Sequence, residues 1–203
     1  MDYESCLELL RSRRSVRRFT HRKPARAQIE RLIEAAGWAP SNHNRQGWKF
    51  IVFEDTQRIG ELAERSRQSV RNAIASAHRP AAGQADELIR FAGAFDQAPV
   101  LILAMHKKSP AVGKALLASA VSELASGEAL STAMAVQNLL LAAHAMGLGA
   151  CVMTAPLLAG DVWTSLDDLP AGFEPTCLVA VGHPADRPDP PRRKSLQHVV
   201  EYR

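Results

Sequence analysis

Hydrophobic positions recur at helical spacing near the start of the chain and form strand-like runs further on. Residues 3–12 and 26–38 each carry apolar side chains on one stripe, which predicts two amphipathic helices. The aromatic and β-branched run at 48–53 predicts a strand, and the unbroken apolar run at 99–105 predicts a strand buried on both faces. Between these strands, Asp55 is placed to cap a helix that extends to about residue 77.

The second half of the chain continues this alternation. Residues 128–146 are apolar almost all round, which predicts a buried central helix that ends at Gly147. Further predicted elements are a helix up to about residue 95, strands at 150–153 and 177–182, and a short helix at 161–166. Residues 78–84 are expected to interrupt the regular secondary structure and to form a flap. A turn-rich connection is expected at 107–113, and irregular structure in the proline-rich stretch 184–191.

Helices and strands alternate without an internal repeat, so the chain is expected to form one layered α/β or α+β domain over residues 1–203. The length of 203 residues suits a single domain. With 46% hydrophobic and 23% charged residues, the composition excludes a mainly disordered chain. The net charge of +4 favours an anionic ligand but is too small to indicate a nucleic acid by itself.

Cysteine usage and the apolar segments indicate the environment of the protein. The 3 cysteines are widely separated and form no CxxC pair, which argues against a disulfide framework or a zinc site. The apolar stretch 130–153 contains polar residues and reads as a core helix followed by a strand, so no membrane span is expected. The N-terminus resembles neither a secretory signal nor a transit peptide, and a cytoplasmic protein is expected.

A basic segment at residues 13–18 is the first candidate for ligand binding. In an extended backbone, Ser15 and Arg17 lie on one face, and Arg14 and Arg18 lie on the other. Guanidinium groups beside a hydroxyl suit the oxygens of a phosphate group. A solvated basic run is the alternative interpretation of this local sequence.

Two other polar segments, and the absence of common motifs, complete the candidate chemistry. The loop at 40–48 offers uncharged donors and acceptors that suit the edge of a heteroaromatic ring, or alternatively form an asparagine-rich turn. The basic trio at 192–194, taken alone, reads as a surface patch. No GxGxxG, GxxxxGK[ST], HExxH or GxSxG motif occurs, and the 7 histidines show no metal-ligand spacing, so no metal is expected. His144 is expected to be a hydrogen-bonded core histidine.

Together and in this order, these segments resemble the nitroreductase-like flavoprotein family. The matching stretches are RRSVRRF at 13–19, AAGWAPSNHNRQGWKFIVF at 35–53, AVQNLLLAAHAMGLGACVMTAP at 135–156 and VAVGHPADRPDPPRRKSLQHVV at 179–200. The resemblance implies an α+β fold with a central mixed sheet flanked by helices. It also implies a domain-swapped homodimer that binds two FMN molecules at the subunit interface.

The resemblance further implies which residues contact the cofactor. Residues that match the segment binding the FMN phosphate and ring edge are Arg13, Arg14, Ser15 and Arg17, joined by the late phosphate-binding Arg193. Residues that match a loop reaching the flavin from the other subunit are Pro40, Ser41, Asn42, Asn44 and Gln46. Residues that match the strand end under the isoalloxazine ring are Val152, Met153 and Thr154.

Two positions depart from the family pattern. Gly47 stands where many relatives have proline before the tryptophan, so a looser loop is expected. Thr154 stands where some relatives carry glutamate, which leaves the choice of substrate open.

The activity implied by the resemblance is that of an FMN-dependent oxidoreductase. It would use NAD(P)H to reduce nitroaromatics, quinones or similar small acceptors by ping-pong hydride transfer, with no catalytic side chain. Dehalogenation, alkene or aldehyde reduction, and flavin fragmentation are alternatives on the same fold. A nucleic-acid-binding module using residues 11–23 is a further alternative, but only Tyr3 and Phe19 supply aromatic rings near the arginines.

Independently, the apolar helix at 128–146 predicts a homodimer, since a two-layer monomer of this size can hardly cover it.

Overall fold

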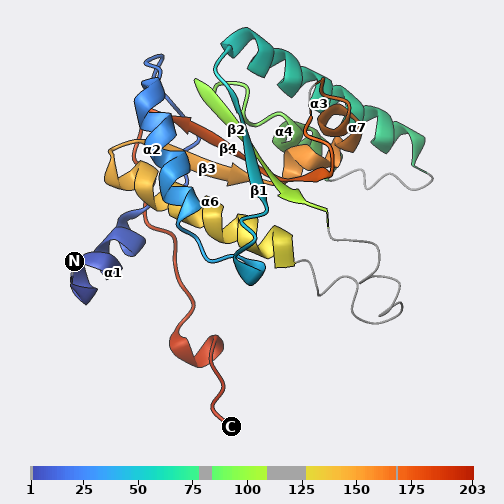
Figure 1. Ribbon diagram of the computed structural model, residues 1–203. Helices are drawn as coiled ribbons and strands as arrows, with labels where there is room; N and C mark the ends of the chain where they lie inside the picture. The colour runs from blue at the N-terminus through green and yellow to red at the C-terminus, as the bar shows by residue number, and fades with distance from the viewer. Residues whose placement is uncertain (1, 78–83, 109–126, 168) are drawn as a thin grey trace.

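A four-stranded sheet forms the centre of the protein in the computed structural model, which describes residues 2–77, 84–108, 127–167 and 169–203. Its strands are β1 (Trp48–Phe53), β2 (Val100–Lys107), β3 (Gly149–Met153) and β4 (Phe173–Gly182), arranged in the order β1-β2-β4-β3 (Figure 1). All three pairings between these strands are antiparallel. The predicted mixed character is therefore limited, among the described residues, to an isolated parallel bridge between Ser15 and Ala150.

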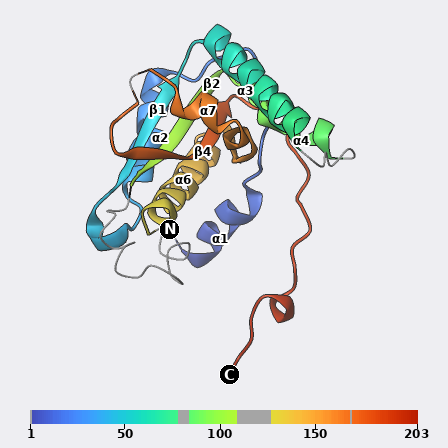
Figure 2. The same ribbon diagram turned by 90° about the vertical axis from the view of Figure 1, so that its right-hand side faces the viewer.

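Helices pack on both faces of this sheet, which makes an α+β sandwich as predicted (Figures 1 and 2). One face is covered by α2 (Arg26–Gly37) and α6 (Gly127–Ala145). The other face is covered by α3 (Thr56–Ser76), α4 (Ala85–Ala92) and α7 (Gly160–Thr164). Alternate residues of β2 enter the two cores, which confirms that this strand is buried on both sides. None of the described helices is long and apolar enough to cross a membrane.

Several predicted boundaries are confirmed. The helix expected at 3–12 is α1 (Tyr3–Ser12), and β1 also has its predicted bounds. The Asp55 carboxylate caps α3 by accepting a hydrogen bond from the Gln57 backbone amide at 2.9 Å. Gly147 follows Met146, the residue after the end of α6, and adopts a φ of 72°, the left-handed conformation in which many helices end. The break expected at 78–84 and the connection at 107–113 lie mostly outside the described residues.

Two boundaries differ most from the prediction, while those of β2, β3 and α7 differ by one or two residues. The helix expected to reach residue 95 ends at Ala92, before Gly93. Strand β4 begins at Phe173 rather than at 177, although Pro175 lies within it. This proline is tolerated because β3 pairs only with residues 178–182, so the first part of β4 is an edge. The register with β2 also shifts between Ala104 and Met105, opposite this part of β4.

Helix α6 is buried on one face only within a single chain. Ala135, Leu139 and Ala143 are buried against the sheet. On another face, Leu130 is 62% exposed and Met134 is 41% exposed. The prediction of a fully buried helix thus holds for the sheet-facing side, while apolar side chains on the outer side have no cover among the described residues.

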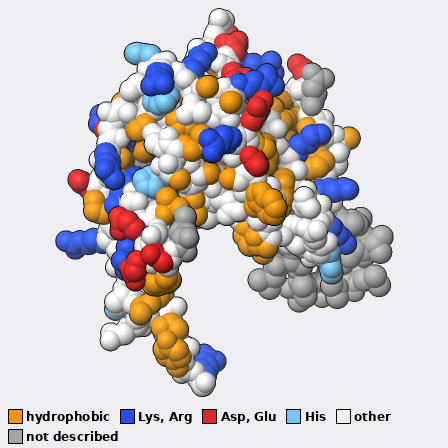
Figure 3. Space-filling model, turned by 60° about the vertical axis from the view of Figure 1, so that its left-hand side comes forward, with side chains coloured by type: hydrophobic (Ala, Val, Ile, Leu, Met, Phe, Trp, Pro, Cys, Tyr) orange, Lys and Arg blue, Asp and Glu red, His pale blue; other side chains and the backbone are white. Residues whose placement is uncertain are grey.

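The C-terminal segment leaves the body of the molecule after β4. Figures 1 and 2 both show residues beyond 190 projecting away from the sheet, with one short 3₁₀ turn, η3 (Leu196–His198). Leu196 is 77% exposed and Tyr202 is 91% exposed. Hydrophobic side chains are visible along the projecting segment at the bottom of the space-filling view (Figure 3). Irregular structure was predicted for 184–191, and it is interrupted only by a bridge between Phe19 and Pro184.

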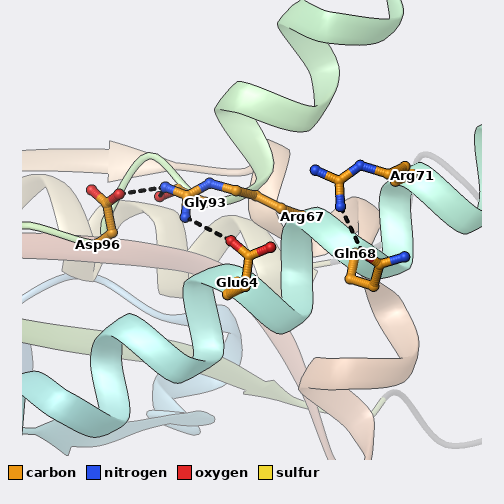
Figure 4. Close-up of polar contacts among 6 residues, drawn as sticks. All are labelled: Glu64, Arg67, Gln68, Arg71, Gly93 and Asp96. Atoms are coloured by element: carbon orange, nitrogen blue, oxygen red, sulfur yellow. Dashed lines mark hydrogen bonds and ion pairs between the residues drawn. The ribbon is translucent and has the colours of Figure 1, made fainter.

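Arg67 joins α3 to the turn that follows α4 (Figure 4). Its guanidinium donates to the Gly93 carbonyl at 2.9 Å and pairs with Glu64 at 3.3 Å and with Asp96. We expect Arg67→Ala to lower the free energy of unfolding by about 1.5 kcal/mol, since hydrogen bonds to charged groups contribute about this much. Urea denaturation measures the change.

Arg71 provides the matched control for this prediction. It lies one turn further along α3 and donates to Gln68 of the same helix at 2.6 Å (Figure 4). Because this contact is local and exposed, Arg71→Ala is expected to change the free energy of unfolding by less than about 0.5 kcal/mol. Equal losses in the two variants would contradict the role assigned to Arg67.

Candidate functional site

The basic segment at residues 13–18 lies beside β3. Ser15 bridges Ala150, and the Val16 backbone amide donates to the Ala150 carbonyl at 3.1 Å. Val16 is buried against Gly149, where an added Cβ would lie 2.7 Å from Val16 Cγ1. The close approach of the two segments therefore requires glycine at this position. These contacts hold the segment extended, as predicted from the sequence.

The arginines of this segment have two different surroundings. Arg14 donates to the carbonyls of Arg11 and Arg13 at 2.5 and 2.8 Å, and it lines a pocket of about 390 Å³ together with Arg193. Burial raises the pKa of the Cys151 thiol in β3. The positive charges of Arg17 and Arg13 oppose this rise. The structure thus brings Arg14 and Arg193 together, and the charges of Arg13 and Arg17 lie near enough to Cys151 to affect its pKa.

His144 lies at the end of α6 that faces α1. Its Nε2 atom is 2.8 Å from the Ser12 hydroxyl, so the predicted hydrogen bond of this histidine is confirmed, but His144 is half-buried rather than a core residue. Partial burial lowers the pKa of His144 below its ordinary value of 6.5. The positive charges of Arg187, Arg13 and Arg14 lower this pKa further. The environment of His144 is therefore one that favours its neutral form.

The lowered pKa of His144 predicts a loss of stability in mild acid. Below pH 6.5 the unfolded chain binds more protons than the folded chain at this position, until the pH falls through the lower pKa of the folded state. We expect the free energy of unfolding to decrease in this window and His144→Asn to reduce the slope. Urea denaturation at a series of pH values measures both chains. Identical slopes would show that His144 is not responsible.

The end of β3 is accessible beside the basic segment. Val152 is exposed, Met153 is half-buried, and the exposed Thr154 precedes the 3₁₀ turn η2 (Ala155–Leu158). Of the residues predicted to lie under a ring system, Val152 and Met153 therefore end the strand that the basic segment follows, and Thr154 comes directly after it. Among the described residues, no group of three His, Cys, Asp or Glu side chains is arranged to hold a metal ion.

The polar loop predicted at 40–48 lies at the opposite end of α6, where residues 41–47 (the 41–47 loop) lead into β1. It contains the 3₁₀ turn η1 (Asn42–Asn44), which the sequence did not predict. His43, Asn44 and Gln46 adopt φ values of 50°, 52° and 48°. Non-glycine residues reach this left-handed region at a cost of about 1–2 kcal/mol each, with asparagine the most tolerant. The surrounding structure must therefore hold the loop in place.

Hydrogen bonds within the loop and to α6 hold this conformation. The Asn42 backbone amide donates to the Ser131 hydroxyl at 3.0 Å, and the Gln46 backbone amide donates to the Ser41 hydroxyl at the same distance. The Gln46 side-chain amide donates to Asn44 Oδ1 at 3.3 Å. Of the loop residues predicted to contact a cofactor, Pro40, Asn42, Asn44 and Gln46 are exposed, and Ser41 is half-buried.

Gly47, where a looser loop is expected from the sequence, is held by contacts on two sides. The Gly47 carbonyl accepts a hydrogen bond from the Lys107 amide at 2.7 Å. A Cβ at this position would lie 2.5 Å from Glu128 Oε2. The space next to Gly47 is thus filled by the Glu128 carboxylate, which keeps the residue buried. Sequence reasoning missed Glu128, whose one signal was an acidic residue at the start of an otherwise apolar helix.

The two halves of the predicted site lie far apart within one chain. The loop contacts α6 at Ser131, whereas the basic segment approaches it at His144. With a rise of 1.5 Å per residue, these positions are separated by about 20 Å along the helix. A single chain therefore does not bring the loop to the basic segment.

Comparisons with known proteins place this geometry in context. The profile of the Nitroreductase family matches residues 10–183. The chain is 28% identical to the FMN reductase [NAD(P)H] of Bacillus subtilis (strain 168), over 89% of this chain and 66% of that protein. It is 30% identical to the iodotyrosine deiodinase of Drosophila melanogaster, over 95% of this chain and 68% of that protein. The chain thus spans about two thirds of the length of these relatives.

Solved structures share the fold across the whole chain. A BluB-like flavoprotein from Clostridium difficile 630 superimposes with a TM-score of 0.83 at 21% identity, covering 100% of this chain and 99% of that chain. A nitroreductase with bound FMN from Desulfitobacterium hafniense DCB-2 superimposes with a TM-score of 0.71 at 21% identity, with the same coverage. The α+β sandwich described above is therefore the fold of these proteins.

Proposed function

The chain belongs to the nitroreductase family, and from this membership we propose that it is an FMN-dependent oxidoreductase that uses NAD(P)H. Its acceptors would be small organic molecules such as nitroaromatics or quinones. The observation that carries the proposal is the extended basic segment held against β3, beside an accessible strand end. The FMN reductase relative supports both the cofactor and NAD(P)H as the electron donor.

The donor set of the basic segment fits FMN. Arg13 and Arg17 supply guanidinium groups and Ser15 supplies a hydroxyl, which together suit a phosphate group. Arg14 and Arg193 add two further cations on the side that faces the tail. Val152, Met153 and Thr154 at the end of β3 would lie under the isoalloxazine ring. We name no metal and no nucleic acid as a partner.

A homodimer would unite the two halves of the site. Two copies with their α6 helices side by side and antiparallel would bring the loop of one copy toward the basic segment of the other. The exposed Leu130 and Met134 would be buried by such a contact. The tail of each copy, with its exposed apolar residues, would pack on the other copy as a swapped segment. This arrangement gives cover to apolar surfaces that the described residues of one chain leave exposed.

The residues of the chain serve to bind and orient in this proposal. Bound FMN would supply the redox chemistry between NAD(P)H and the acceptor. The arginines and Ser15 hold the phosphate end, while the loop amides and asparagines of the second copy cover the ring. No side chain is assigned as an acid, a base or a nucleophile.

Reductive dehalogenation is a second candidate reaction. The iodotyrosine deiodinase relative, at 30% identity over 95% of the chain, favours it. The same flavin site would serve, because the two reactions differ in the acceptor rather than in the cofactor. Measuring iodide release alongside nitro-group reduction on the same preparation separates the two candidates.

Steady-state kinetics test the mechanism. If one pocket binds NAD(P)H and the acceptor in turn, double-reciprocal plots at several acceptor concentrations should be parallel. Intersecting lines would mean that both substrates bind together.

His43→Ala should change turnover less than tenfold. General acid–base roles typically contribute about 10²–10⁴-fold, and the proposal assigns no such role to His43. A hundredfold loss of turnover in the variant with FMN still bound would make His43 catalytic.

A further inference from the structure

Three left-handed residues make the loop at 41–47 dependent on contacts outside itself. His43, Asn44 and Gln46 all have positive φ values. The loop meets two other parts of the chain, the strand end at Lys107 and the first turns of α6. The contacts with α6 come from Ser131, which accepts from the Asn42 amide, and from Glu128.

Glu128 is the one buried carboxylate among the described residues. Its side chain is 6% exposed, and Oε1 lies 3.5 Å from the Nη1 atom of Arg45 in the loop. Its second oxygen, Oε2, has no hydrogen-bond partner among the described residues and lies beside Gly47. The Glu128 carboxylate therefore lies between two loop residues, with the Arg45 guanidinium near one oxygen and Gly47 beside the other.

A buried charge of this kind constrains its surroundings. Removing a carboxylate from water is unfavourable unless a cation compensates it, so Glu128 favours the loop conformation that brings Arg45 to it. Its place in the first turn of α6 is also favourable for a negative charge. Any side chain at position 47 would displace the carboxylate, so Gly47 and Glu128 depend on each other.

We propose that Glu128 is a positioning residue that holds the 41–47 loop, through Arg45, in the conformation that contacts the isoalloxazine ring. Gly47 is the residue that admits the carboxylate. The proposal rests on the proposed flavin function, because that function assigns the loop to the ring. It assigns no contact between Glu128 and the cofactor. The loop is held at a second point by Ser131, so Glu128 sets the geometry of its Arg45–Gly47 half.

Limited trypsin digestion tests the proposal without any cofactor. Trypsin cleaves after Arg45 only when this part of the loop can open. Glu128→Gln keeps the size of the side chain but removes its charge, and we expect it to increase the rate of cleavage at the Arg45–Gln46 bond at least tenfold. Glu87→Gln is the matched control, because Glu87 pairs with Arg90 at 3.8 Å on the exposed side of α4. This control should leave the rate at Arg45 unchanged.

Ligand titration provides a second readout, using FMN and riboflavin as probes. Because the loop is assigned to the ring and not to the phosphate, Glu128→Gln should weaken both ligands by the same factor, at least tenfold. Gly47→Ala removes no charged group but displaces the Glu128 carboxylate, so it should have the same effect on cleavage and on both affinities. It tests the same contact should the Gln variant fail to fold.

The outcomes separate this proposal from the proposed function. Wild-type rates of cleavage at Arg45 in both Glu128→Gln and Gly47→Ala would overturn the positioning role, even if the protein binds FMN. A loss of FMN affinity without a loss of riboflavin affinity would also overturn it. If the wild-type protein binds neither ligand, the flavin function fails, while the cleavage rates still decide whether Glu128 holds the loop.

Discussion

Arg13→Ala is expected to weaken FMN binding at least tenfold while leaving riboflavin binding nearly unchanged. Arg13 belongs to the extended segment held beside β3 and is assigned to the phosphate group. Loss of one partner in a charge-assisted hydrogen bond costs about 1.5–3 kcal/mol, which corresponds to about 10- to 150-fold in affinity. Titration of the apoprotein with the two ligands measures the difference, since riboflavin lacks the phosphate.

Arg18→Ala is the matched control for this substitution. Arg18 lies in the same basic segment, but it forms an ion pair with Asp186 at 2.5 Å and is not assigned to the cofactor. It should leave both affinities within about twofold of wild type, as is usual for an exposed ion pair. Equal losses for FMN and riboflavin in Arg13→Ala would show that the phosphate is not its target.

Removal of residues 189–203 is expected to weaken dimerisation at least 1,000-fold. The removed segment carries Leu196, Val199, Val200 and Tyr202, all exposed in a single chain. Burying aliphatic side chains of this size against a second copy contributes about 1.5–3 kcal/mol each. Together they exceed about 4 kcal/mol, the equivalent of a thousandfold in a dissociation constant. Sedimentation velocity across a dilution series measures the change.

A single substitution tests whether the apolar side chains of the tail or its positive charge stabilise the dimer. Arg192→Ala removes one cation of the basic trio but keeps every apolar side chain of the tail, so it should leave the dimer intact. A truncated chain that remains dimeric at nanomolar concentration would contradict the swapped tail. A monomeric wild-type chain at the same concentration would contradict the dimer itself.

Local patterns were sufficient to predict most of the fold. The helical stripe of α1 and the β-branched run of β1 gave the correct bounds, because each element is defined by its own periodicity. The start of β4 was missed because Pro175 argues against a strand, and its tolerance depends on where β3 stops pairing. The outer face of α6 was assigned to the interior because hydrophobicity alone does not say which neighbour covers it.

The sequence was sufficient to predict which segments form the candidate site, but not how they are arranged in space. The motifs identified the basic segment, the polar loop and the strand end, and the structure brings the first and last of these together. The left-handed loop and its contact with α6 could not be predicted, since the Asn42–Ser131 hydrogen bond joins residues 89 positions apart. Glu128 was missed for the same reason, because its burial depends on the glycine at position 47.

Measuring the FMN stoichiometry of the purified dimer tests the central claim most directly. The protein, saturated with FMN and freed of excess ligand, should show the visible absorption of a bound flavin. Absorbance and protein concentration should give one FMN per chain, and sedimentation should show that this flavin travels with the dimer. A dimer that stays colourless and leaves the fluorescence of added FMN unchanged would contradict the assignment of this chain as an FMN-dependent oxidoreductase.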